Sequence, residues 1–186
     1  METLKLIGRS WSLVTLIGAT AIISAAMQPN PKAATTNEDQ TFVTESTEGS
    51  LAEVELGKLA LKKSKNPEVV EFAQKMIIDH TQLVNDMKPV ADQMGVKLPE
   101  KVNTKHEQEV DRLSALSGDQ FDKAYISAMV ADHHHDLAEF TSEESRTQNP
   151  ILKSTVAKGK AVIEMHTHMI DEIAKNNGIQ TPGTPA

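Results

Sequence analysis

The chain has 186 residues, enough for one domain with a sizeable core and barely enough for two. Aromatic residues make up 3% and cysteine is absent, so the core is mainly aliphatic, which suits packed helices, and no metal site can use a thiolate. The 26 acidic residues outnumber the 19 basic ones, giving a net charge of −7 without a Lys/Arg cluster, which excludes nucleic acid as the main partner.

The first 26 residues have the pattern of an export signal. Lys5 and Arg9 precede an uncharged, mainly apolar run over 11–26, which ends in small residues at Ala26. This run is shorter than the roughly 20 residues of a membrane-spanning helix. We therefore expect a signal peptide over 1–26, with an uncleaved anchor as the alternative. Cleavage would leave a periplasmic or envelope protein without a transmembrane segment.

Helical spacing of apolar residues follows a polar, proline-containing linker at 27–38. Pro67 and Pro150 each follow an Asn and mark turns, because proline is favoured at the first position of a helix. Gly95 and Gly118 mark two further breaks. We predict helices at 39–64, 67–95, 102–116, 119–148 and 150–176, and a disordered tail at 177–186.

The predicted domain, residues 39–176, is all-α. Alternating strand patterns and Asn-Gly hairpin signals are absent from the sequence. The four long helices form two hairpins, which are joined by a linker that contains the short helix. One long connection of this kind favours a ferritin-like four-helix bundle with a short extra connecting helix.

Each long helix carries one ionisable residue at the centre of its apolar stripe. In chain order these residues are Glu53, His80, His133 and His166. At 1.5 Å per residue, the first two lie about 20 Å from the turn at Asn66, and the last two lie about 25 Å from the turn at Asn149. If the hairpins dock with matched lengths, all four side chains meet near the middle of the bundle.

One carboxylate and three imidazoles make a suitable ligand set for a divalent transition metal such as Zn, Cu, Mn or Fe. A repeated Met-x-x-Asp-His sequence places further groups beside two of the imidazoles. Asp79 and Asp132 would orient the imidazoles as outer hydrogen-bond acceptors. The thioethers of Met76 and Met129, one turn earlier, would favour copper.

A metal-free network is the alternative interpretation. A buried carboxylate needs a cation or a hydrogen-bond partner, and a protonated imidazole can be that partner. The chain would then be an envelope interaction or stress-related module, with an envelope protein or further copies of itself as partner. Catalytic triad signatures, phosphate loops and Glu-x-x-His pairs are absent from the sequence, so nothing indicates an enzyme.

Several stretches of the sequence together resemble one bacterial family. They are AEVELGKLAL at 52–61, NPEVVEFAQKMIIDH at 66–80, LSGDQFDKAYISAMVADHHHDL at 116–137 and the last helix with its Asn-Pro start and His166. The chain resembles the exported, ferritin-like domain of unknown function 4142, whose members are often labelled outer-membrane proteins. The resemblance covers about residues 40–174 and implies an all-α ferritin-like bundle behind a signal peptide. The matching family positions are Glu53, Asp79, His80, Asp132, His133 and His166.

Overall fold

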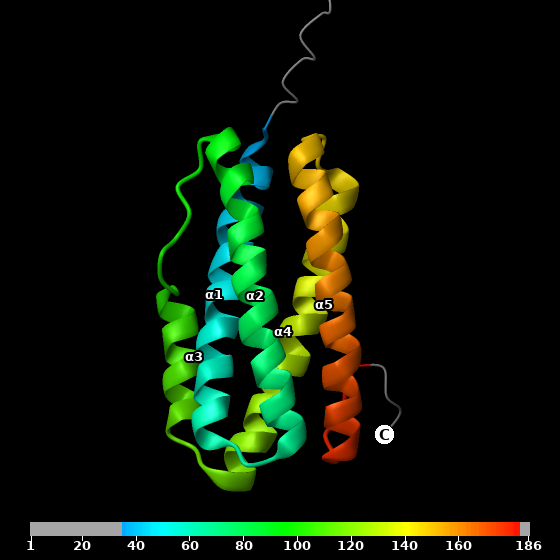
Figure 1. Ribbon diagram of the computed structural model, residues 1–186. Helices are drawn as coiled ribbons and strands as arrows, with labels where there is room; N and C mark the ends of the chain where they lie inside the picture. Colours follow the sequence, from blue (N-terminus) through cyan, green and yellow to red (C-terminus); the bar gives the residue numbers. More distant parts are fainter. Residues whose placement is uncertain (1–34, 183–186) are drawn as a thin grey trace, which may run out of the picture. The chain divides into compact units, whose positions relative to one another are not determined.

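The computed structural model describes residues 35–182, which belong to one compact unit. Five helices follow one another: α1 (Asn37–Lys63), α2 (Pro67–Met94), α3 (Thr104–Ser114), α4 (Gly118–Arg146) and α5 (Pro150–Asn176) (Figure 1). Residues 35–182 contain no strand, and none of their helices is long and apolar enough to cross a membrane. The predicted signal peptide lies outside the described residues.

All five predicted helices are present, and local capping explains where their ends differ from the prediction. Thr36 and Asp39 form a capping box at the start of α1, so this helix begins two residues earlier than predicted. Asn103 caps α3 through its side chain, which moves the start of that helix to Thr104. The α2 helix includes Pro89 and ends before Gly95, whose φ of 72° is left-handed.

The four long helices form a bundle in which α1 packs on α2, α2 on α5, α5 on α4 and α4 on α1. In Figure 1 the α1–α2 turn lies at the lower end and the α4–α5 turn at the upper end, so the two hairpins dock in opposite orientations. The connection from α2 to α4 carries α3 back along α1. This single long crossover is the ferritin-like arrangement, which confirms the predicted fold class.

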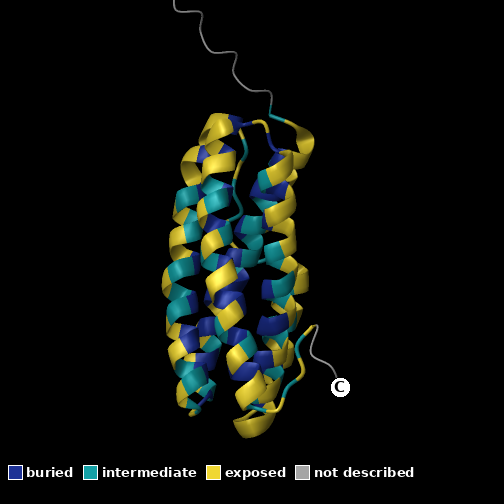
Figure 2. Cartoon of the chain, turned by 90° about the vertical axis from the view of Figure 1, so that its right-hand side faces the viewer, coloured by how far each residue is buried: buried dark blue, intermediate teal, exposed yellow. Residues whose placement is uncertain are grey.

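Two apolar clusters fill the interior, and the buried residues lie on the inner faces of the helices (Figure 2). The cluster near the α1–α2 turn includes Phe72 and Ile170, and the cluster near the α4–α5 turn includes Phe140 and Ile163. Three buried histidines occupy the level between the two clusters. Leu61 near the end of α1 points outward and is 39% exposed.

The first residues of the predicted tail contact the bundle. The side-chain amide of Asn177 donates a hydrogen bond to the Glu68 carboxylate at 3.2 Å. Ile179 packs against the cluster near the α1–α2 turn. The ordered domain therefore extends past residue 176.

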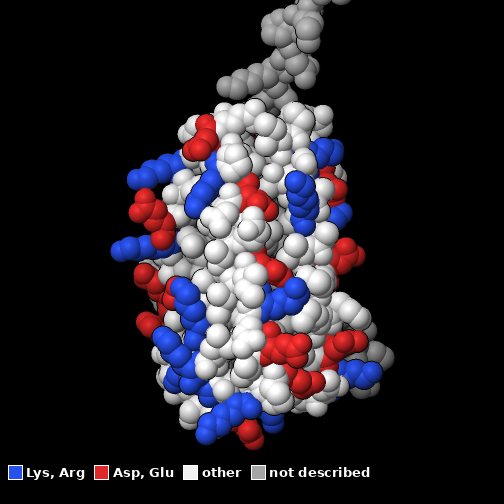
Figure 3. Space-filling view, viewed as in Figure 1, with Lys and Arg blue, Asp and Glu red and all other residues white. Residues whose placement is uncertain are grey.

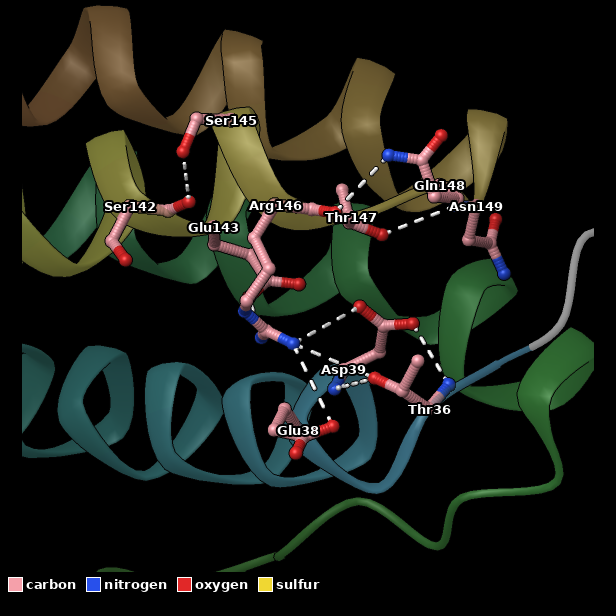
Figure 4. A network of polar contacts seen from close by, with 10 residues as sticks. All are labelled: Thr36, Glu38, Asp39, Ser142, Glu143, Ser145, Arg146, Thr147, Gln148 and Asn149. Carbon is pink, nitrogen blue, oxygen red and sulfur yellow. Dashed lines mark hydrogen bonds and ion pairs between the residues drawn. The ribbon is translucent and has the colours of Figure 1, made fainter.

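A network of polar side chains joins the start of α1 to the end of α4 (Figure 4). The guanidinium of Arg146 pairs with Glu143 and lies 3.9 Å from carboxylate oxygens of both Glu38 and Asp39. Burial and a hydrogen bond with Asp39 raise the pKa of Glu143 to about 7, against the opposing pull of Arg146. Although burial opposes it, hydrogen bonds from Thr36 and Glu143 lower the pKa of Asp39. At a pH between the pKa values of these two carboxyls, the pair therefore carries one proton, which is on Glu143.

This shared proton predicts a pH dependence of stability. Between pH 4.5 and about 7 the folded protein keeps a proton on Glu143 that the unfolded chain has released. The free energy of unfolding of the wild type, relative to Glu143→Gln, should therefore fall as the pH rises through this window. Urea unfolding of both proteins at several pH values measures the difference. A difference that stays constant from pH 4.5 to 7 would contradict the shared proton.

A close approach of α4 and α5 depends on Gly159. A Cβ added there would lie 2.6 Å from Cε1 of Phe140, whereas a Cβ added at Gly49 in α1 would meet nothing within 4 Å. Gly159→Ala should lower the free energy of unfolding by about 1–3 kcal/mol through overpacking. Gly49→Ala should raise it by up to about 1 kcal/mol, because alanine favours the helix. Urea titration tests both variants. A Gly159→Ala protein that is stabilised as much as Gly49→Ala would contradict the close packing of α4 and α5.

Candidate metal centre

Three imidazoles from three helices meet in the layer between the two apolar clusters. His80 comes from α2, His133 from α4 and His166 from α5, and each is at most 1% exposed. One nitrogen from each ring lies within 4.8 Å of the corresponding nitrogens of the other two. The ring centroids are 5.4 to 5.8 Å apart. This is the convergence that the apolar stripes predicted for the three histidines.

The environment of His133 leaves one ring nitrogen with a free lone pair. Its Nδ1 lies 2.9 Å from the carbonyl oxygen of Met129, one turn earlier in α4, and donates a hydrogen bond to it. The proton therefore sits on Nδ1, and Nε2 is buried without a partner among the described residues. The Phe72 ring packs against the imidazole in a T-shaped arrangement, with the centroids 5.8 Å apart. These contacts fix both the tautomer and the position of the ring.

His166 offers its other nitrogen. Its Nε2 donates to Oδ2 of Asp79 at 2.8 Å, and Nδ1 is left buried and unpaired within residues 35–182. The same Asp79 oxygen lies 2.9 Å from the ammonium of Lys75. Although burial opposes it, the hydrogen bonds from Lys75 and His166 lower the pKa of Asp79. His80 completes the group, and neither of its ring nitrogens has a partner in the described chain.

The protein environment keeps the three imidazoles neutral. Burial lowers the pKa of His133 to about 3. Burial also lowers the pKa of His80 well below its ordinary value, and the neighbouring histidines add to this effect. For His166, burial lowers the pKa against the pull of Asp79. Neutral imidazole is the form that binds a metal, so the centre presents three competent nitrogen donors.

Glu53, the fourth predicted ligand, lies beside this group and not within it. Its side chain is buried, and Oε1 is 3.9 Å from Nδ1 of His133, too far for a hydrogen bond. That nitrogen faces the Met129 carbonyl, so Glu53 sits on the side of the ring away from Nε2. Burial raises the pKa of Glu53 well above its ordinary value, and Asp132 and Asp136 add to the shift. The structure thus brings together three of the four predicted ligands.

The residues predicted to support the ligands take different places. Asp79 orients the imidazole of His166 across the helix interface and makes no hydrogen bond with its neighbour His80. Asp132 makes no hydrogen bond with an imidazole in the described range and lines a cavity instead. Burial, with Glu109 nearby, raises the pKa of Asp132 to about 6.

The two methionines of the repeat, Met76 and Met129, belong to the apolar cluster near the α1–α2 turn. The contribution of Met129 to the centre comes from its carbonyl oxygen and not from its sulfur. The hydroxyl of Tyr125, which was not among the predicted site residues, is also buried without a partner among residues 35–182. Burial raises the pKa of Tyr125 well above its ordinary value, and Glu53 adds to the shift. Tyr125 lies two helical turns before His133 on the same apolar stripe, and this spacing was the sequence signal that could have identified it.

The fold and the site define an all-helical bundle with a buried cluster of three imidazoles at its centre. Residues 24–173 match the family described as a domain of unknown function, DUF4142, and the chain belongs to this family. No curated protein matches the chain.

Two solved structures share the fold. One is a DUF305 fragment from Deinococcus radiodurans, with 16% identity and a TM-score of 0.67, covering 78% of this chain and 99% of that chain. The other is a DUF305 protein from Streptomyces coelicolor, assigned as secreted, with 13% identity and a TM-score of 0.66, covering 80% and 97%. At these identities the likeness establishes the helical bundle alone.

The hydrogen bonds predict opposite tautomers for two of the rings. In protein treated with a chelator at pH 7, His133 should carry its proton on Nδ1 and His166 on Nε2. Long-range proton–nitrogen NMR correlations distinguish these tautomers directly. Asp79→Asn should weaken the preference of His166 and leave that of His133 unchanged. Two rings with the same tautomer, or two protonated rings, would contradict this geometry.

Proposed function

We propose that the chain binds one divalent first-row transition-metal ion, of the Zn, Cu, Mn or Fe class, through His80, His133 and His166. One observation carries the proposal: three buried imidazoles from different helices direct nitrogens to within 4.8 Å of one another. Nitrogen-rich donor sets of this kind suit first-row transition metals, whereas Ca and Mg are bound by oxygen.

The spacing of the nitrogens fits one shared ion. Imidazole nitrogens bound to one tetrahedral zinc ion at about 2.0–2.1 Å are about 3.4 Å apart. The separations here reach at most 4.8 Å, so inward shifts of less than about 1 Å per ring would close a coordination shell. Three protein ligands leave a fourth position open. Water is the candidate for it, because Glu53 lies on the Nδ1 side of the His133 ring.

The unpaired nitrogens favour a metal over a purely structural network. In a structural network the imidazoles would bond to Glu53 or to one another. The Glu53 oxygen instead lies 3.9 Å from His133, and His80 has no partner for either nitrogen within residues 35–182. A bound cation would give one nitrogen of each ring a partner.

We also propose that the domain works outside the cytoplasm, in the periplasm or cell envelope. The support is the basic start, apolar run and small residues of the first 26 positions. One structural relative, the Streptomyces coelicolor protein, is assigned as secreted.

Metal analysis tests the proposed centre. The wild type, purified without chelators, should contain about one transition-metal ion per chain, and adding the preferred ion should raise its Tm. His133→Gln and His166→Gln should lose this binding. His168→Gln on α5, whose side chain is 77% exposed, should retain it. Elemental analysis and thermal shift with Zn²⁺, Cu²⁺, Mn²⁺ and Fe²⁺ provide the measurement. A folded wild type that binds none of these ions stoichiometrically would overturn the proposal.

A further inference from the structure

A cavity of about 340 Å³ opens between α1 and α4, beside the crossover that carries α3. Its acidic side chains come from two long helices and lie at different depths. They are Glu45, Glu48, Glu53, Asp132, Asp136 and Glu139. Lys105 is the one Lys or Arg among the described residues that line it. We call this space the acidic cavity.

The acidic cavity runs from solvent to Glu53, which lies beside the imidazole centre. Glu45 and Glu139 are exposed at its outer part, and Asp132 and Asp136 are half-buried. Glu53 is only 3% exposed, so it marks the inner part. Its Oε2 has no partner among residues 35–182, and its Oε1 lies 3.9 Å from Nδ1 of His133. The lining of the cavity therefore ends beside one of the three imidazoles.

The spacing of the carboxylates decides what this cavity can hold. Within the described chain, the three histidines are the one group of three or more ligand residues whose atoms lie within 4.8 Å of one another. The acidic cavity therefore lacks a ready coordination shell that would replace the water around an ion. A cation with six waters, at about 30 Å³ each, needs about 180 Å³ and fits the volume. Clefts with mainly acidic walls also concentrate cations, raising association rates by about 10- to 1,000-fold.

We propose that the acidic cavity is the access path by which hydrated divalent transition-metal cations reach the imidazole centre. The outer carboxylates attract the cation, and Asp132 and Asp136 hold it with its waters. Glu53 then releases its proton to the water in the cavity and is the first group to replace a bound water. The imidazoles of His80, His133 and His166 then replace the remaining waters. This path rests on the metal centre proposed above.

Stopped-flow binding of cobalt(II), followed by its visible absorption, tests the path. Asp136→Asn combined with Glu139→Gln removes two carboxyl groups from the cavity and no imidazole. The matched control, Glu164→Gln with Glu172→Gln, removes two charges from α5, which does not line the cavity. At low ionic strength the cavity variant should bind cobalt(II) at least about 10-fold more slowly than the control, with the Kd changed by less than about 3-fold.

Glu53→Gln provides a second variant that keeps the side-chain volume at the inner end. It should also slow association, and circular dichroism shows whether each variant is folded. Association of the cavity variant as fast as that of the control would overturn the path. If the wild type binds two ions and the cavity variant only one, the access path would also be overturned, because the cavity would then be a second binding site. A wild type that binds no cobalt(II) at equilibrium would overturn the metal centre itself, so the two failures are distinguishable.

Discussion

The structure depends on the burial of three neutral imidazoles in one layer between two apolar clusters. A buried polar group without a hydrogen-bond partner costs about 1–3 kcal/mol, and four imidazole nitrogens of this layer have none within the described chain. Packing on both sides keeps the rings in place, with Phe72 against His133 and His166. The layer also sets the relative heights of α2, α4 and α5, because each ring must face the other two.

The groups that orient the rings are distributed across the helix interfaces. α2 supplies one imidazole and also the carboxylate of Asp79, which orients the ring of α5. α4 orients its own ring through the Met129 carbonyl, using a backbone group that no side-chain substitution removes. The surface of the bundle, in contrast, mixes Lys, Arg, Asp and Glu on the face seen in Figure 3. The concentration of carboxylates around the acidic cavity differs from this mixed pattern.

Much of the fold and part of the site could be predicted from the apolar stripes. A stripe gives the direction of a side chain around its own helix axis, and for His80, His133 and His166 that direction was inward. The stripe does not give the rotation of one helix against the next. The pairing of Asp79 with His166 and the position of Glu53 outside the imidazole group could therefore not be predicted. The orientation of the hairpins was also open. The histidines still meet, because each lies near the middle of a helix about 40 Å long. Inverting a hairpin therefore hardly changes the height of its histidines along the bundle axis.

The three imidazoles lie on both hairpins, and the long crossover separates His80 from His133 and His166 in the sequence. An isolated α1–α2 hairpin carries only one of them, and an isolated α4–α5 hairpin carries two. A ligand that needs all three therefore recognises only the completely assembled domain, and its binding energy adds to the native state without stabilising partial folds. The three-imidazole centre would therefore be completed last in folding, after the contacts between residues most distant in the chain have formed.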